Sequence, residues 1–265
     1  MRVTVLGCGG SGGVPLLGND WGNCDPANPK NRRRRVSVLV EGEGTSILID
    51  TSPDLRMQLL DAGVSRLDAV LFTHDHADHT HGIDDLRFLR RSKDEPLLQA
   101  YGSGSTLASL MRRFGYIFRQ SQEGSGALYR PFLAAQEIEG PFQVGGLSVV
   151  PFDQDHGFGT MTTGFRITGE GGKCAMAYST DVVRLPEESL AELHDLDLWI
   201  VDCLRFEPHP THAHFDQVLE WVSLLKPRRT VLTHLNQTMD YETLRRRCPA
   251  GIEPAYDGLV VNIPG

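Results

Sequence analysis

Three histidines and two aspartates fall within seven consecutive residues of this chain, in the segment Thr73-His74-Asp75-His76-Ala77-Asp78-His79. The segment directly follows the apolar run 67–72, which predicts a short buried strand. Imidazole and carboxylate are ligands that zinc, manganese and iron prefer. His74 and His76 can face one side of an extended turn, whereas Asp78 and His79 face elsewhere, so the loop could serve two metals. We therefore predict a metal site here rather than a solvated polar loop.

Strands and helices alternate along the chain, with no repeat and no low-complexity linker. Strands are predicted at 3–6, 36–40, 46–49, 67–72, 97–101, 147–151, 162–168, 174–179, 198–202 and 230–233. Helices are predicted at 54–62, 83–91, 105–114, 186–194, 215–225 and 241–247, with Ser105 as the cap of the third. Residues 115–141 have weak periodicity and are interpreted as an insertion. Strand-rich halves with outer helices predict one α/β domain over residues 1–265, built as a sandwich of two sheets.

The composition narrows the classes of function. A net charge of −8 argues against nucleic acid as the partner, because nucleic-acid-binding surfaces are normally basic. The five cysteines are odd in number and form no CxxC pair, which favours a reducing compartment. The N-terminal apolar stretch is too short for a signal peptide, and no window approaches a membrane span. We expect a cytoplasmic protein without membrane contact.

Three further metal-ligand side chains each follow an apolar strand. They are His156, Asp181 and His234. The residues just past strand ends are where α/β proteins gather functional side chains. Taken singly, each is more often an ordinary polar loop residue than a ligand. Together with the first cluster they complete a set of seven ligands for two metals.

In order and in strand context these seven residues resemble the metallo-β-lactamase superfamily, over nearly the whole chain. The resemblance implies an αββα four-layer sandwich with a dinuclear centre at one edge. It implies that His74, His76 and His156 hold the first metal, that Asp78, His79 and His234 hold the second, and that Asp181 bridges them. An aspartate rather than a cysteine at the bridging position is similar to the phosphodiesterase and glyoxalase branches.

The N-terminal segment Gly7-Cys8-Gly9-Gly10-Ser11-Gly12-Gly13-Val14-Pro15 resembles the start of phosphodiesterases in this superfamily. The nearest likeness is to the phosphoribosyl cyclic phosphodiesterase (PhnP-like) branch, and tRNA 3′-processing nucleases start similarly. A glycine-rich loop lets backbone N–H groups approach a phosphate, so we assign Gly9 and Gly10 to substrate binding, with a tight turn as the alternative. That branch also has a cysteine-rich loop for a structural zinc, of which only Cys24 remains here.

A second stretch, Thr211-His212-Ala213-His214-Phe215-Asp216, matches the HxD element of the same branch through His214 and Asp216. Because a helix N-terminus favours an anion, we assign His214 to substrate binding and to protonation of the leaving group. His212 is a further substrate contact or a solvated loop residue. Asp78 is given a catalytic role beside its role as a ligand, and Asp75 is expected to orient a ligand histidine. The run Arg32–Arg35 is either a phosphate contact or a solvated edge.

These observations predict a dinuclear hydrolase with two divalent ions, zinc or manganese. Its substrate would be a small cyclic or nucleotide-like phosphodiester, attacked by a hydroxide held between the metals. One alternative is a tRNA 3′-processing endoribonuclease, which the acidic charge disfavours. Others are a non-catalytic protein that binds a nucleotide or cofactor precursor, and a glyoxalase-type thioester hydrolase. The chain is also a candidate homodimer.

Overall fold

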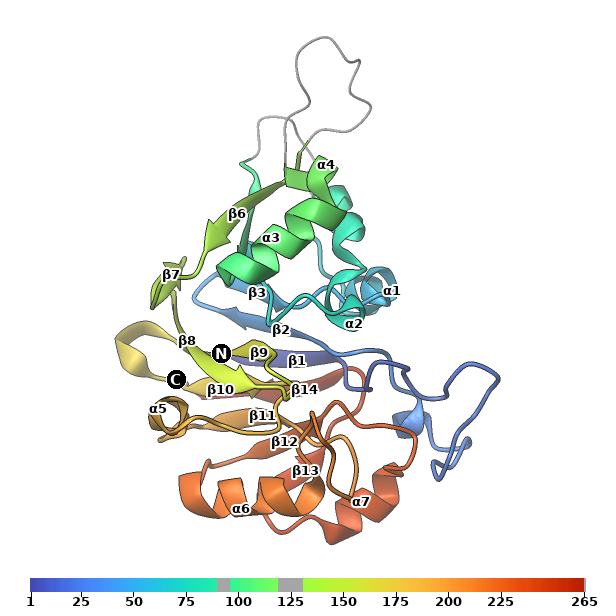
Figure 1. Cartoon of the computed structure of the whole chain (residues 1–265). Helices are drawn as coiled ribbons and strands as arrows, with labels where there is room; N and C mark the ends of the chain where they lie inside the picture. The colour runs from blue at the N-terminus through green and yellow to red at the C-terminus, as the bar shows by residue number, and fades with distance from the viewer. Residues whose placement is uncertain (90–95, 119–130, 265) are drawn as a thin grey trace.

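The computed structural model describes residues 1–89, 96–118 and 131–264. It shows two mixed β-sheets packed face to face, with helices on both outer faces (Figure 1). The α/β four-layer sandwich predicted from the sequence is confirmed.

The first sheet has the strand order β14-β1-β2-β3-β4-β5-β6. Its strands are β1 (Arg2–Gly7), β2 (Ser37–Gly42), β3 (Thr45–Ile49), β4 (Ala69–Leu71), β5 (Leu98–Gly102), β6 (Leu133–Glu137) and β14 (Leu259–Asn262). Neighbours are antiparallel from β14 to β3 and parallel from β3 to β6.

The second sheet repeats this pattern in the order β13-β12-β11-β10-β9-β8-β7. Its strands are β7 (Phe142–Val144), β8 (Leu147–Asp155), β9 (Met161–Thr168), β10 (Met176–Ser179), β11 (Leu198–Asp202), β12 (Thr230–Thr233) and β13 (Ile252–Pro254). Neighbours are parallel from β13 to β10 and antiparallel from β10 to β7. Each sheet thus brings the carboxyl ends of several parallel strands to one edge.

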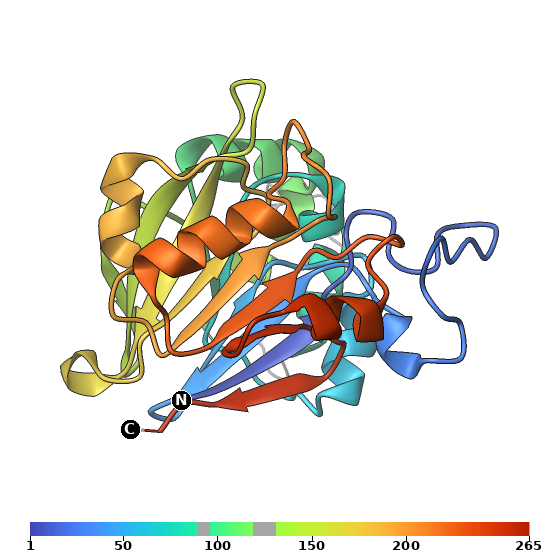
Figure 2. The same cartoon turned by 90° about the horizontal axis from the view of Figure 1, so that it is seen from below.

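Helices cover the outer face of each sheet. Those over the first sheet are α1 (Leu55–Asp61), α2 (Ala77–Thr80), α3 (Gly104–Arg113) and α4 (Gly115–Phe118), with the 3₁₀ helix η2 (Ile83–Leu89). Those over the second are α5 (Glu187–Leu190), α6 (Phe215–Leu225), α7 (Tyr241–Arg247) and η4 (Ala191–Leu193). Figure 2 shows α6 lying across that sheet. Two further 3₁₀ turns are η1 (Pro29–Asn31) and η3 (Glu170–Gly172).

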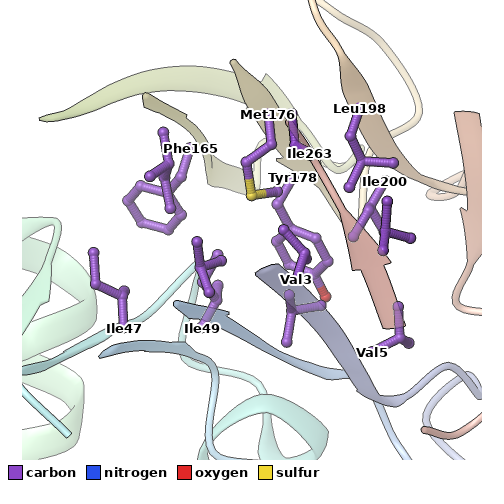
Figure 3. Close-up of a cluster of buried hydrophobic side chains, with 14 of the residues drawn as sticks. Val3, Val5, Ile47, Ile49, Phe165, Met176, Tyr178, Leu198, Ile200 and Ile263 are labelled. Carbon is purple, nitrogen blue, oxygen red and sulfur yellow. The ribbon is translucent and has the colours of Figure 1, made fainter. Parts of the chain in front are cut away.

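The main core lies between the two sheets. Alternate residues of β1 and β3, such as Val3 and Ile49, face Phe165, Tyr178 and Ile200 of the second sheet, and all are fully buried (Figure 3). Period-two alternation in each strand produces this inward face, while the opposite face packs under the helices. Burial of apolar side chains on both faces makes the sheets a rigid platform for the loops at their edge.

Several local expectations need correction. Ser103, not Ser105, caps α3, because its hydroxyl accepts a hydrogen bond from the N–H of Thr106 at 3.3 Å. The helix expected at 83–91 is a 3₁₀ helix as far as Leu89, and residues 90 and 91 lie outside the described residues.

The segment 115–141, interpreted as an insertion, contributes regular structure on both sides of residues 119–130, which lie outside the described part. Helix α4 precedes that gap, and strand β6 pairs in parallel with β5 along its whole length. The sequence of β6, Leu133-Ala134-Ala135-Gln136-Glu137, lacks β-branched residues, so pairing with β5 rather than intrinsic strand propensity makes it a strand. Among the described residues, no helix is long and apolar enough to cross a membrane.

Candidate metal centre

Six polar side chains lie at or just beyond strand ends, at one edge of the sandwich. Asp50 follows β3, His74 follows β4, His156 follows β8, Asp181 follows β10, Asp202 ends β11 and His234 follows β12. The backbone is in the left-handed region at Asp50 (φ 60°), Asp181 (φ 53°) and His234 (φ 58°). Non-glycine residues rarely adopt this conformation, and such strain concentrates at functional sites. The chain turns sharply at these three residues and directs their side chains into the cluster.

Asp181 occupies the middle of the cluster. Its Oδ1 lies 3.9 Å from Nε2 of His74 and 3.6 Å from Nε2 of His156. Its Oδ2 lies 3.1 Å from Nε2 of His79 and 3.4 Å from Nε2 of His234. The two carboxylate oxygens therefore face two different sets of imidazoles.

These sets form two groups whose ligand atoms lie within 4.8 Å of one another. The first contains His74, His76, His156 and Asp181, and the second contains Asp78, His79, Asp181 and His234. All seven residues singled out in the sequence are brought together, with Asp181 common to both groups. His76 is the exposed member, and Asp78 is partly buried.

In three of these histidines, His74, His79 and His156, the Nδ1 atom contacts another polar group of the protein. Nδ1 of His74 lies 3.0 Å from Oγ1 of Thr73, and Nδ1 of His156 donates to the carbonyl oxygen of Thr211 at 2.8 Å. Nδ1 of His79 donates to Asp50 at 2.8 Å. These contacts fix each ring so that Nε2 faces the centre, as expected for metal-binding histidines.

Sequence reasoning missed two carboxylates, Asp50 and Asp202. Both are fully buried, and both follow the strand-end pattern that was used to choose Asp181 and His234. The orienting role expected of Asp75 belongs instead to Asp50. Asp75 lies outside the cluster, where its carboxylate accepts from Ser109 at 2.5 Å.

His212, rather than His214, lies against the cluster. Nδ1 of His212 donates to Oδ2 of Asp202 at 2.8 Å, and its Nε2 is 3.9 Å from Asp181. Its ring stacks on that of His234, with centroids 4.7 Å apart. His214 is the N-cap residue of α6, in extended backbone conformation, and it belongs to none of the groups of possible metal ligands among the described residues.

In the glycine-rich loop, the N–H groups of Gly9 and Gly10 are already hydrogen-bonded within the protein and are not available to a phosphate. The N–H of Gly9 donates to the carbonyl of Arg34 at 2.8 Å, and that of Gly10 donates to Leu235 at 3.3 Å. A Cβ at Gly10 would lie 3.5 Å from the ring of His234. The tight-turn interpretation fits these hydrogen bonds better than the substrate contact assigned to Gly9 and Gly10. Gly10 lets the loop approach His234 closely, whereas Gly9 packs against Arg33 and Arg34.

The run Arg32–Arg35 is engaged within the protein. Arg34 pairs with Asp61 at 2.7 Å, Arg35 pairs with Asp54 at 3.0 Å, and Arg32 lies over the ring of Trp21 at 5.0 Å. Arg33 is fully buried and donates to the carbonyl oxygens of Asn236 and Met239, in the loop that follows His234. The run therefore holds the N-terminal loop, drawn in blue in Figure 1, against the segment beyond the cluster.

Burial and charge set the protonation of the cluster. Burial raises the pKa of Asp181, but the imidazoles of His234 and His79 outweigh it, so the net pKa is well below the usual range. Burial together with the charge of His79 lowers the pKa of His74 well below its usual value. The centre thus keeps an ionised carboxylate among imidazoles whose nitrogens face inward.

The cluster fits divalent metal ions. Among the described residues, the buried Nε2 atoms of His74, His79 and His234 have no hydrogen-bond partner. A buried unpartnered polar atom costs about 1–3 kcal/mol, so three side by side demand a compensating ligand. With neutral imidazoles the seven-residue donor set carries two negative charges, those of Asp78 and Asp181. It is the nitrogen and oxygen set that zinc and manganese accept.

A family model, the β-lactamase superfamily domain, matches residues 45–235 of the chain. This chain is a metallo-β-lactamase superfamily protein. The superfamily assignment predicted from the seven residues is confirmed, and the chain has the fold of this family with clustered His/Asp groups that could hold metal ions.

Within the superfamily, a solved structure of a diphosphatase from the PhnP family has 35% sequence identity, covers 98% of this chain and 97% of its own, and superimposes with a TM-score of 0.87. An octanoyltransferase of Porphyromonas gingivalis is 34% identical over 262 residues, which is 98% of this chain. A ribonuclease Z of Bradyrhizobium is 38% identical over 89 residues, 32% of this chain. The chain spans 51% of the octanoyltransferase and 29% of the ribonuclease.

Proposed function

We propose that this protein hydrolyses a small nucleotide-like phosphodiester, cyclic or linear, with two divalent ions, zinc or manganese. The observation that carries the proposal is the position of Asp181, whose two oxygens face two complete groups of ligands. Such a carboxylate can serve both ions of a dinuclear site. The similarity to a PhnP-family diphosphatase over nearly the whole of both chains supports a phosphorus centre as the target.

We assign the ligands as the two groups divide them. One ion is held by His74, His76 and His156, the other by Asp78, His79 and His234, and Asp181 is shared. When bound, divalent ions at these positions would supply acidified water and positive charge beside the phosphoryl oxygens. Burial raises the pKa of Asp78, but the neighbouring imidazoles of His79 and His234 hold it below its usual range. Asp78 therefore acts as an ionised ligand.

Among the protein's own side chains, His212 is best placed to act as the general acid. Asp202 fixes Nδ1 of His212 as the donor nitrogen, so Nε2 is left free toward Asp181 and the space beside it. We propose that Nε2 of His212 delivers a proton to the leaving oxygen, the role that the sequence motif had suggested for His214.

Cleavage of a phosphoanhydride is a close variant of this reaction. The similar solved structure is that of a diphosphatase, and a P–O–P bond presents the same phosphoryl oxygens to a dinuclear site. Action on tRNA has less support, since the ribonuclease Z relatives match only 32% to 51% of this chain and the net charge is −8.

The test uses apo-protein reconstituted with Mn²⁺ or Zn²⁺ and three substrates: bis-p-nitrophenyl phosphate, 2′,3′-cyclic AMP and ADP-ribose. We expect turnover of at least one substrate with one metal, and loss of that turnover in Asp181→Asn. The exposed variant Leu17→Ala serves as a matched control, because Leu17 belongs to neither ligand group. Absence of turnover with both metals, or binding of nucleotide without hydrolysis over hours, would reject the proposal in favour of a binding protein.

A further inference from the structure

The turn between β8 and β9 begins at the cluster residue His156 and carries an exposed aromatic ring. Phe158 follows His156 by two residues and is 88% exposed. Exposure of a whole phenylalanine side chain forgoes the stabilisation that burial of its apolar surface would give. A ring in this position therefore needs an explanation beyond stability.

The backbone of Phe158 adds to this cost. Its φ is +52°, in the left-handed region, and it lies between Gly157 (φ 86°) and Gly159 (φ 80°). Glycine adopts such angles freely, whereas a bulky residue there is strained. The middle position of this turn would suit a third glycine better, yet it holds a phenylalanine.

The turn is held in place rather than hanging free. The N–H of His156 donates to the carbonyl of Thr160 at 2.9 Å, and the N–H of Gly157 donates to Asp155 at 2.7 Å. Gly157 packs so closely on the loop after β11 that a Cβ there would lie 2.5 Å from the carbonyl oxygen of Pro210. Figure 2 shows the two loops side by side at the edge of the sheet. The backbone that carries Phe158 is thus fixed beside His156 and the segment that carries His212.

A protein partner explains this feature less well. Of the other large exposed apolar residues in the described part of the chain, only Met161 belongs to the same hairpin. Protein interfaces need a broad apolar surface, whereas one presented ring suits one flat ligand group. Stacking of a nucleobase on an aromatic side chain uses such a ring and tolerates different bases.

We propose that Phe158 is the platform on which a nucleobase or a comparable flat aromatic group of the substrate stacks while its phosphate lies at the metals. This inference rests on the proposed function and narrows its substrates to phosphate esters that carry an aromatic ring. Phe158 then determines specificity and takes no part in the proton transfers.

The binding test does not require turnover. Affinities of AMP and of inorganic phosphate are measured for the Mn²⁺-loaded protein and for Phe158→Ala, Phe158→Trp and Leu17→Ala. We expect Phe158→Ala to lower the affinity for AMP about tenfold and to leave the affinity for phosphate unchanged. The Phe158→Trp variant and the Leu17→Ala control should keep the wild-type affinity for AMP. Equal AMP affinity in wild type and Phe158→Ala would overturn the platform, whatever the activity. Thermal unfolding of each variant checks that it is folded.

The kinetic test separates this inference from the proposed function. 2′,3′-Cyclic AMP carries a base, and glycerol 1,2-cyclic phosphate presents a similar ring phosphate without one. Phe158→Ala should raise KM for the first substrate about tenfold, with kcat and the second substrate unaffected. An equal effect on both substrates, or preference of the wild type for the glycerol compound, would reject the platform while leaving phosphodiester hydrolysis intact. No turnover of either compound would count against the proposed function instead.

Discussion

Nδ1 of His79 lies 2.8 Å from Oδ2 of Asp50, and both side chains are fully buried. The same carboxylate accepts from the N–H and the hydroxyl of Thr73, each at 2.8 Å. Asp50 thereby ties the end of β3 to the start of the metal loop and to a ligand on α2. Asp50 therefore orients the ring of His79 even when no metal is bound.

Substitution of this carboxylate should weaken metal binding. In Asp50→Asn one of the two accepting oxygens is replaced by an NH2 group that can only donate, so His79 loses part of its orientation. We expect a 10–100-fold loss of metal affinity or activity, the range typical of such supporting residues. Metal titration followed by elemental analysis measures it. Asp75→Asn is the matched control, because Asp75 lies in the same loop but outside the cluster, and an equal loss there would contradict the assignment.

Substitutions of His212 and His214, the two histidines before α6, should have clearly different effects on kcat. His212→Ala should lower kcat by a factor of about 10²–10⁴ on a substrate with a poor leaving group, because a general acid contributes about that much. The loss should be smaller with p-nitrophenyl esters, whose leaving group needs no proton. His214→Ala should retain kcat, since His214 belongs to none of the ligand groups found among the described residues and is the N-cap of α6. The reverse order of the two variants would return the acid role to His214.

Metal removal should destabilise the fold. The unpartnered Nε2 atoms of His74, His79 and His234 gain ligand bonds only when metal is bound. At a free metal concentration one hundred times Kd, binding adds about 2.7 kcal/mol of stability, equivalent to roughly 5–10 °C in Tm. Thermal unfolding with and without a chelator measures the shift. In Asp181→Asn the chelator should change Tm very little. If the chelator also left the wild-type Tm unchanged, that result would argue against these ligands.

A carboxyl group away from the metals should make stability depend on pH. Burial raises the pKa of Asp257 to about 6, despite its hydrogen bonds from the N–H groups of Arg34 and Cys8. In the unfolded chain the same group titrates near 3.8. Between about pH 4 and pH 6 the folded protein therefore binds a proton that the unfolded chain has released.

Stability from Asp257 is accordingly greatest below about pH 4 and falls as the pH rises to 6, by about 2 kcal/mol for this partly exposed side chain. Denaturant unfolding across pH 4–8 measures the slope, and the difference between wild type and Asp257→Asn isolates this group from the histidines. Parallel pH profiles for the two proteins would show that Asp257 does not titrate in this range.

Much of this molecule follows from local sequence pattern. The bounds of α6 and α7 agree with the predicted 215–225 and 241–247, because amphipathic spacing and caps such as Asp240 are local signals. The seven metal-ligand candidates could be chosen for the same reason, since each follows an apolar strand. Strand β6, with its Ala-rich sequence, could not be chosen, because it becomes a strand only by pairing with β5.

The sequence by itself determined the strand-end pattern, the superfamily and the residues able to ligate two metals. Only the tertiary structure decided which polar side chains share a centre: it placed Asp50 behind His79 and Asp202 behind His212, and it left His214 out of the ligand groups of the described residues. It also engaged the N–H groups of Gly9 and Gly10 within the protein. The physical reason is that a residue's type and spacing set what it can bind, whereas its partners are set by long-range packing of the two sheets.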